Sequence, residues 1–271
     1  MTVARQKCIT PWIRRLRYFG SRLFGTRLQK SQKVYLVEIG GQRFKRIVLH
    51  DAFLASRMAG NLEAFGPTPY LPRLVICYEQ EVWVDYVAGR TVNAVDADFI
   101  SQLAGLYGHL YARAPQQIAV PGSVWADRID RDLDFLQRVG IIDGRLHAAL
   151  MRRLPDMLPV QAWTGYDYTD PVLKNFVRST NGQLVAIDVE SLEAGQLLGL
   201  GVAKACARWM GPYRETFFTA LRQTQALDIL PYFEFVELVF AASYAKLMYL
   251  ERKWKRIDVR QFERFCAAHE P

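Results

Sequence analysis

The sequence YTDPVLKNFV, residues Tyr168–Val177, has an aspartate before a proline and closes with an asparagine and an apolar run. Asp170 precedes Asn175 by five residues, and a second apolar run, QLVAID, follows the dipeptide Asn181-Gly182. Because Asn-Gly between two such runs is a strong hairpin signal, we expect a β-hairpin here. Asp188, which ends the return strand, should then lie at the same end of the hairpin as Asp170 and Asn175.

These three side chains carry oxygen atoms of the kind that Mg²⁺ prefers, and such a site leaves other positions of the ion free for phosphates. Phosphoryl transfer needs in addition a carboxylate that orients the attacking hydroxyl. Taken singly, Asp170 before Pro171 and Asp188 at a strand end are ordinary turn residues. Their combination around one hairpin favours a site for a metal ion and phosphates.

The first ninety residues predict a hairpin, a helix and a second hairpin. Residues 34–39 and 43–49 are rich in strand-forming residues and flank Gly40-Gly41, which makes a tight turn easy. Residues 51–65 have helical apolar spacing, with Asp51 as the N-cap. After a loop that contains Pro67, Pro69 and Pro72, residues 73–87 predict two more strands.

The remainder of the chain is predicted to be mainly helical. The exception is residues 163–190, which contain the hairpin around Asn181-Gly182. The predicted helices are 96–114, 124–139, 144–154, 199–209, 215–224, 232–254 and 259–268.

The pattern of an Asp, four residues, an Asn and an Asp that ends a hairpin resembles the catalytic and metal loops of the protein-kinase-like superfamily. The closer resemblance is to its bacterial small-molecule branches, the aminoglycoside and choline phosphotransferases and the lipopolysaccharide core kinases. These often have an acidic residue two positions after the metal aspartate, as Glu190 is here. From about Val34 onward, the resemblance implies an α+β, bilobal fold with a small antiparallel-sheet N-lobe and a larger helical C-lobe.

The resemblance also implies roles for particular residues and the use of ATP and Mg²⁺. Asp170 would orient the acceptor hydroxyl and accept its proton, and Asn175 and Asp188 would hold Mg²⁺. Lys45 would pair with the α- and β-phosphates, although Arg46 is one register step away. The remaining implied contacts are Glu63 as the helix partner of Lys45, Lys174 near the γ-phosphate, and the backbone of Asp85 and Val87 at the hinge EVWVDYVAGRTV for adenine.

Several positions depart from the family pattern. Tyr168 and Thr169 stand where the family commonly has His and then Gly or Arg, and Arg57 stands where a helix glutamate is expected. No glycine-rich phosphate loop can be read in the sequence. These departures leave open a catalytically inactive, pseudokinase-like binding module. A third alternative is a protein kinase. Two observations argue against it: DVE replaces the usual metal-loop sequence, and no A-P-E motif follows.

The net charge of +8 is concentrated at the N-terminus: residues 1–50 contain twelve Lys/Arg and one acid, whereas the other 221 residues have a net charge of −3. Such a distribution does not favour nucleic-acid binding. Trp12, Leu16, Phe19 and Leu23 have helical spacing among arginines, which predicts a basic amphipathic helix that either contacts an anionic membrane or packs on its own domain. The four cysteines have no paired spacing, which fits a reducing cytosol.

We therefore expect a basic segment at 1–30, an N-lobe at 31–88 and a C-lobe at 89–271, with the catalytic loop at 166–176 and the metal loop at 187–191. The predicted function is ATP- and Mg²⁺-dependent transfer of a phosphoryl group to a hydroxyl of a small molecule or sugar. A narrower expectation is a lipid-linked sugar of the lipopolysaccharide core, met at the cytoplasmic face of the inner membrane. The sequence does not name the acceptor, because substrate choice in this superfamily depends on helical insertions.

Overall fold

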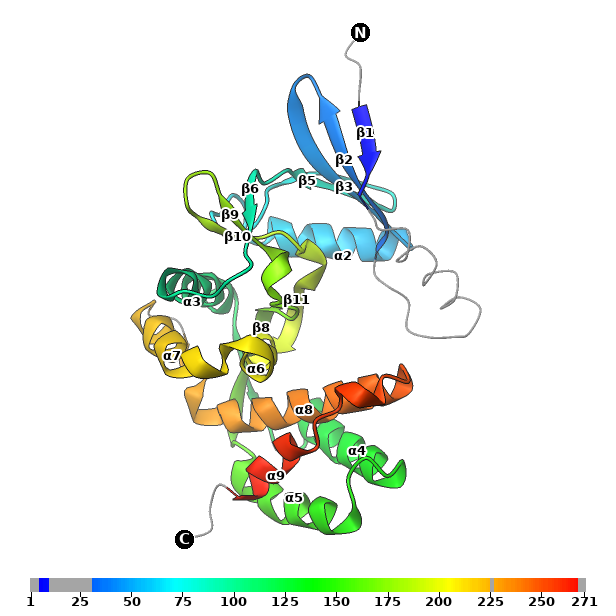
Figure 1. Cartoon of the computed structure of the whole chain (residues 1–271), viewed down its shortest axis with the longest axis vertical. Coiled ribbons are helices and arrows are strands. Elements are labelled where there is room, and N and C mark those ends of the chain that lie inside the picture. Colours follow the sequence, from blue (N-terminus) through cyan, green and yellow to red (C-terminus); the bar gives the residue numbers. More distant parts are fainter. Residues whose placement is uncertain (1–4, 10–30, 225–226, 268–271) are drawn as a thin grey trace. The chain divides into compact units, whose positions relative to one another are not determined.

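A computed structural model describes residues 5–9, 31–224 and 227–267 (Figure 1). The chain divides into two compact units, one made of Met1–Leu106 and Asp170–Ala194 and the other of Tyr107–Thr169 and Gly195–Pro271. The strands are β1 (Arg5–Cys8), β2 (Ser31–Ile39), β3 (Gln42–Leu49), β4 (Leu74–Tyr78), β5 (Glu81–Asp85), β6 (Gly89–Thr91), β7 (Gln116–Ala119), β8 (Gln161–Tyr168), β9 (Phe176–Ser179), β10 (Leu184–Ala186) and β11 (Leu192–Leu197). The helices are α2 (Ala52–Glu63), α3 (Ala97–Tyr111), α4 (Val124–Arg138), α5 (Gly144–Met157), α6 (Leu200–Ala205), α7 (Arg214–Gln223), α8 (Phe233–Leu250) and α9 (Arg260–Ala267).

The first unit contains a five-stranded antiparallel sheet with the order β1-β2-β3-β5-β4. The predicted hairpin is confirmed: β2 and β3 meet at Gly40 and Gly41, whose φ angles of 59° and 79° suit glycine and give the turn that follows strand twist. In the sheet, Lys45 of β3 lies opposite Leu36 of β2 and Val84 of β5.

Helix α2 confirms the prediction for residues 51–65. The Asp51 carboxylate accepts a hydrogen bond of 2.8 Å from the Leu54 amide, which caps the first turn. Ala55, Met58 and Leu62 are buried at helical spacing, and the helix packs on β4 and β5. The helix therefore lies on the sheet by its apolar stripe.

The hairpin predicted around Asn181-Gly182 is formed by β9 and β10, and β6 adds a third strand to β9. The Phe99 ring of α3 makes an edge contact with Phe176 at 5.7 Å between ring centroids. These contacts place residues 89–106 and 170–194 in the first unit, whereas the sequence-based ranges 31–88 and 89–271 follow chain order. The difference arises because long-range strand pairing, unlike chain order, decides which residues pack together.

The second unit is mainly helical, as predicted, and α8 passes through it next to α4 and α6 (Figure 1). No helix in residues 31–224 or 227–267 combines the length and apolar character needed to cross a membrane. The sequence did not predict β1, β7, β8 or β11; β8 lies between β7 and β11 in a three-stranded sheet. The amphipathic helix predicted over Trp12–Phe24 falls outside the described residues.

Candidate active site

Asn175 connects the two loops that carry the predicted site. It ends a short 3-10 turn, Leu173–Asn175, and its side chain is 7% exposed. Its Nδ2 donates to the Asp170 carbonyl oxygen at 2.8 Å and to Asp188 Oδ2 at 3.2 Å, with Asp170 Oδ2 at 3.4 Å as a further acceptor. One amide group thus brings together the three residues that the spacing had predicted to converge, all within the first unit.

Two further bonds fix the segment that carries Asp188. The backbone amide of Ile187 donates to the Asn175 carbonyl oxygen at 2.8 Å. The Ser191 hydroxyl donates to Asp188 Oδ2 at 3.0 Å, so this carboxylate oxygen accepts two bonds. Asp188 and Asp170 are both half-buried. The two carboxylates are therefore oriented by fixed donors while part of each side chain remains open to solvent.

The oxygen atoms left over at this cluster fit a hard divalent cation. Because Nδ2 of Asn175 is used as a donor, its Oδ1 remains as an acceptor, and Asp188 Oδ1 is the second carboxylate oxygen beside it. Amide and carboxylate oxygens in small number suit Mg²⁺, which keeps several positions for water or phosphate. Within the described residues, no group of three or more His, Cys, Asp or Glu side chains gathers as a metal site.

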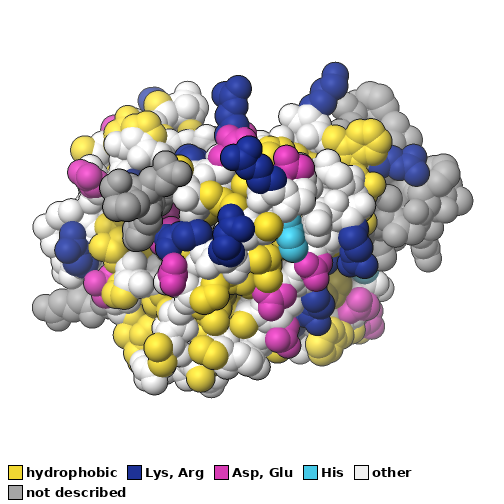
Figure 2. Space-filling view, turned by 90° about the horizontal axis from the view of Figure 1, so that it is seen from below, with side chains coloured by type: hydrophobic (Ala, Val, Ile, Leu, Met, Phe, Trp, Pro, Cys, Tyr) yellow, Lys and Arg dark blue, Asp and Glu magenta, His cyan; other side chains and the backbone are white. Residues whose placement is uncertain are grey.

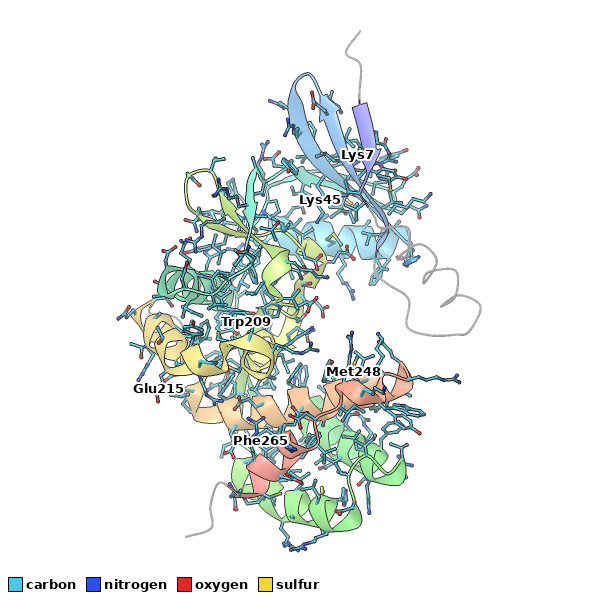
Figure 3. All side chains as sticks on the ribbon, in the orientation of Figure 1. Lys7, Lys45, Trp209, Glu215, Met248 and Phe265 are labelled. Carbon is cyan, nitrogen blue, oxygen red and sulfur yellow. The ribbon has the colours of Figure 1, made fainter. Side chains whose placement is uncertain are left out.

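Lys45 lies beside the same loop, on β3 of the first unit (Figure 3). Its Nζ donates to the carbonyl oxygen of Ile187, the residue before Asp188, at 2.7 Å. Arg46 is held elsewhere: its guanidinium pairs with both carboxylate oxygens of Glu81 and lies 5.6 Å from the centroid of the Trp83 ring. Of the two neighbouring cations, Lys45 is the one that the structure brings to the Asp188 segment.

Glu63 does not join this cluster. It is the last residue of α2, and it is exposed. Its negative charge contributes to the raised pKa of the Cys77 thiol, after burial of that thiol as the main cause. The helix-end position explains the difference, since the buried stripe of α2 ends at Leu62.

The other predicted contacts are spread over the first unit. Lys174 is exposed in the turn before Asn175. Asp85 is tied to Arg73 twice, by an ion pair of 2.9 Å between side chains and by its amide, which donates to the Arg73 carbonyl at 2.9 Å. Val87 follows the end of β5, and no hydrogen bond to its backbone occurs within residues 31–224.

Asn61 is a residue of this region that the sequence analysis missed. It is 9% exposed in α2, and its Nδ2 donates to the Leu192 carbonyl oxygen at 3.0 Å. This bond joins α2 to the chain that follows the metal loop. The sequence did contain a signal for this contact, because Asn61 lies within the apolar stripe of a predicted helix. A side-chain amide that is buried there requires a hydrogen-bond partner elsewhere in the fold.

In the second unit, Asp167 fixes the end of β8, which leads into Asp170. Asp167 is fully buried, and its Oδ2 accepts hydrogen bonds from the amides of Gly199 (3.0 Å) and Gly201 (3.2 Å) at the start of α6. Burial raises the pKa of the Asp167 carboxyl to about 7, although these amide donors oppose the shift. A Cβ atom on Gly201 would lie 2.0 Å from the Tyr168 carbonyl oxygen, so only glycine permits this close approach.

No family model matches the sequence, and no curated protein matches it either. Solved structures do match its fold. A macrolide 2'-phosphotransferase from Brachybacterium faecium is 13% identical with a TM-score of 0.60, over 96% of this chain and 99% of that one. A choline kinase from Streptococcus pneumoniae is 13% identical with a TM-score of 0.58, over 96% and 100%.

A third match is a thermostable mutant of an aminoglycoside phosphotransferase, solved as a ternary complex with ADP and hygromycin B. It is 13% identical with a TM-score of 0.57, over 93% of this chain and 98% of that one. Identities at this level show the fold alone. The chain has the protein-kinase-like fold of small-molecule phosphotransferases, as its sequence pattern predicted.

Proposed function

We propose that the protein transfers the γ-phosphoryl group of ATP to a hydroxyl group of a small molecule or sugar. The observation that carries the proposal is the Asn175 amide, which holds the Asp170 backbone and the Asp188 carboxylate at one place. The fold supports it, because similar structures include a choline kinase and a phosphotransferase solved with ADP.

Each residue then has a role that follows from its position. Asp170 accepts a hydrogen bond from the acceptor hydroxyl and takes its proton late in the transfer, since general bases act through such contacts. Lys45 contributes positive charge toward the α- and β-phosphates from beside the Asp188 segment. Val87 offers its backbone to adenine. Asn175 Oδ1 and Asp188 would hold Mg²⁺, which when bound supplies charge neutralisation for the phosphates.

A narrower form of the proposal concerns the acceptor. The net charge of +11 in residues 1–50 favours a lipid-linked sugar, such as a lipopolysaccharide core sugar, reached at the inner face of a membrane. In this form the protein works in the cytoplasm and contacts the membrane peripherally through its basic N-terminal segment.

One observation favours a second function, that of a catalytically inactive module which binds nucleotide or a partner. Glu63 is exposed at the last position of α2, whereas active members of the kinase-like superfamily place a helix glutamate beside the strand lysine. The two functions differ in turnover and not in nucleotide binding, so both must be measured.

The test incubates purified protein with labelled ATP, Mg²⁺ and a panel of hydroxyl acceptors, beside Asp170→Asn and Asp188→Ala. We expect transfer to fall by at least about a hundredfold in Asp170→Asn, because a positioned base contributes roughly 10²–10⁴ in rate. Asp188→Ala should also lose the Mg²⁺-dependent rise in melting temperature that ATP produces in the wild type. Equal transfer by all three proteins contradicts the roles, and an ATP-dependent rise in melting temperature without transfer to any acceptor supports the inactive module.

A further inference from the structure

A basic pocket lies in the second unit. It has a volume of about 300 Å³ and is formed by the segment after α6, by α8 and by the start of α9. Arg208, Arg256 and Arg264 line it, against one carboxylate, Asp258. The three arginines are exposed, and Arg264 lies within electrostatic range of Glu237, whose carboxylate is already paired with Arg214. The lining of the pocket therefore carries more positive than negative charge.

One of these arginines is held in place by an aromatic wall. The rings of Phe240 and Tyr244 on α8 are stacked, with centroids 5.6 Å apart and an angle of 21° between their planes. The Arg208 guanidinium lies 4.7 Å from the centroid of the Tyr244 ring. Stacking of this kind orients a guanidinium while its in-plane N–H donors stay available, and such donors match the oxygens of phosphate or carboxylate.

Arg208 is connected to the catalytic loop through a continuous helical stretch. α6 runs on into a π-helical turn, Cys206–Met210, and turns of this type are frequent at functional sites. Lys204, one turn before Arg208, donates from Nζ to the carbonyl oxygen of Thr169 at 3.4 Å, and Thr169 directly precedes Asp170. Figure 3 labels Trp209 in this turn and Phe265 on α9, on the two elements that carry Arg208 and Arg264.

A second basic cavity of the same unit has a smaller excess of positive charge. It has a volume of about 920 Å³ next to α5 and α9, and Arg145, Arg152 and Arg153 share it with Asp143 and Glu263. Arg153 is also paired with Asp156 at 3.0 Å. Lys and Arg side chains gather among acidic ones on the face seen from below (Figure 2). Exposed arginines alone are thus common in this unit, whereas a cationic pocket with an aromatic wall is found beside α6.

We propose that this arginine pocket binds a phosphate or carboxylate group, carried by a small molecule such as a sugar phosphate or by the headgroup of an anionic lipid. The proposal adds a ligand site to the second unit, beyond the proposed function. A cationic ligand, such as an amine-rich sugar, is disfavoured at this surface because it would meet three guanidinium groups and a single carboxylate.

The experiment titrates the full chain, saturated with Mg²⁺ and a non-hydrolysable ATP analogue, so that phosphate probes cannot occupy the nucleotide site. The probes are inorganic phosphate, glucose 6-phosphate, glucose, and dihexanoyl phosphatidylglycerol beside dihexanoyl phosphatidylcholine. We expect glucose 6-phosphate to bind and glucose not to bind. The double variant Arg208→Gln/Arg264→Gln should bind the anionic probes about tenfold more weakly, because charge-assisted hydrogen bonds are lost. Preference for the sugar phosphate or for the anionic lipid identifies the source of the anion.

The matched control is Arg145→Gln/Arg152→Gln, which removes the same charge from the other cavity and should bind the probes as the wild type does. Melting temperatures near that of the wild type establish that each variant is folded. Failure of the wild type to prefer the anionic probes, or an equal loss in the control, overturns the inference. Saturation with the ATP analogue is measured first, and the titration is repeated without the analogue. Binding of the nucleotide without binding of the anionic probes contradicts only this inference. Binding of the anionic probes without binding of the nucleotide contradicts only the proposed function.

Discussion

Asp167 and Asp170 are three residues apart in the chain, yet they lie in two very different environments. Asp170 is half-buried in the first unit, and both its carbonyl oxygen and its carboxylate face the side-chain amide of Asn175. Asp167 is fully buried in the second unit, and its carboxylate accepts hydrogen bonds from the backbone amides of Gly199 and Gly201 at the start of α6. Both residues are aspartates, so the difference in what each carboxylate can do arises from its surroundings.

One short segment therefore contributes to both structure and chemistry. A carboxylate with exposed oxygen can meet a substrate, whereas a carboxylate enclosed by protein can only hold backbone in place. The raised pKa of Asp167 shows that enclosure has an energetic cost, which the two amide donors reduce but do not remove. Three predictions, with five substitutions between them, test this contrast between an open and an enclosed region.

The largest expected effect is on the pH dependence of stability. The pKa of Asp167 is about 7 in the folded chain and about 3.8 when the group is unperturbed, so the folded state retains a proton that the unfolded state releases between these values. The free energy of unfolding should therefore fall as pH rises from about 4 to about 7 and then level off. Asp167→Asn should remove this slope and be more stable at pH 8 by up to about 4 kcal/mol, from about 3 units at 1.36 kcal/mol each.

Urea denaturation at intervals from pH 4 to pH 8 measures this slope, with Asp170→Asn as the control that should keep the wild-type pH dependence. An unchanged slope in Asp167→Asn would show that the charge at this enclosed site is not what sets the dependence.

A smaller effect is expected at two glycines, Gly201 in the enclosed region of the second unit and Gly182 in the turn between β9 and β10 of the first unit. A Cβ at Gly201 would lie 2.0 Å from the Tyr168 carbonyl oxygen and 2.6 Å from the Tyr107 hydroxyl, so Gly201→Ala must displace backbone. We expect a loss of about 3 kcal/mol in the free energy of unfolding. At Gly182 nothing lies within 4 Å, but φ is +84°, so Gly182→Ala should lose only about 1 kcal/mol through backbone strain. Urea denaturation of both variants gives the order, and a larger loss at Gly182 would contradict it.

The smallest effect separates two adjacent cations of the first unit. Arg46→Met loses the ion pair with Glu81, a partly exposed contact that should contribute about 1 kcal/mol to stability while leaving nucleotide affinity unchanged. Lys45→Met should instead weaken ATP binding about tenfold, since a charge-assisted contact to phosphate is lost. Calorimetric titration with ATP and Mg²⁺, beside thermal unfolding, measures both quantities. If Arg46→Met loses ATP affinity and Lys45→Met does not, then Arg46, and not Lys45, contacts the phosphates.

The parts of the fold that local pattern controls could be predicted from the sequence. The Gly40-Gly41 and Asn181-Gly182 hairpins formed because each places glycine where φ is positive. α2 formed because Asp51 caps an apolar stripe. The fixed spacing of Asp170, Asn175 and Asp188 around one hairpin then predicted their meeting, because a short hairpin limits where its ends can lie.

The features that the sequence did not reveal depend on partners far along the chain. β1 has few strand-forming residues, and the Trp, Thr and Tyr residues of β8 are interrupted by Gly165 and Asp167; both strands are defined by pairing, β1 with β2 and β8 with β7. The role of Asp167 requires amides that lie 32 and 34 residues later. Glu63 was expected to meet Lys45, but helix ends are predicted only to within a few residues, and one step along α2 turns a side chain by about 100°.

The amide group of Asn175 has one more consequence, which concerns detection. An NH₂ group has two hydrogens, and here one is donated to Asp170 and the other to Asp188. In a nitrogen-15 spectrum the two protons should therefore resonate separately, each reporting on a different loop. Titration with Mg²⁺ alone should change the chemical shift of the proton bonded to Asp188 more than that of the proton bonded to Asp170. The Asn175 side chain can therefore report Mg²⁺ binding before any acceptor is known.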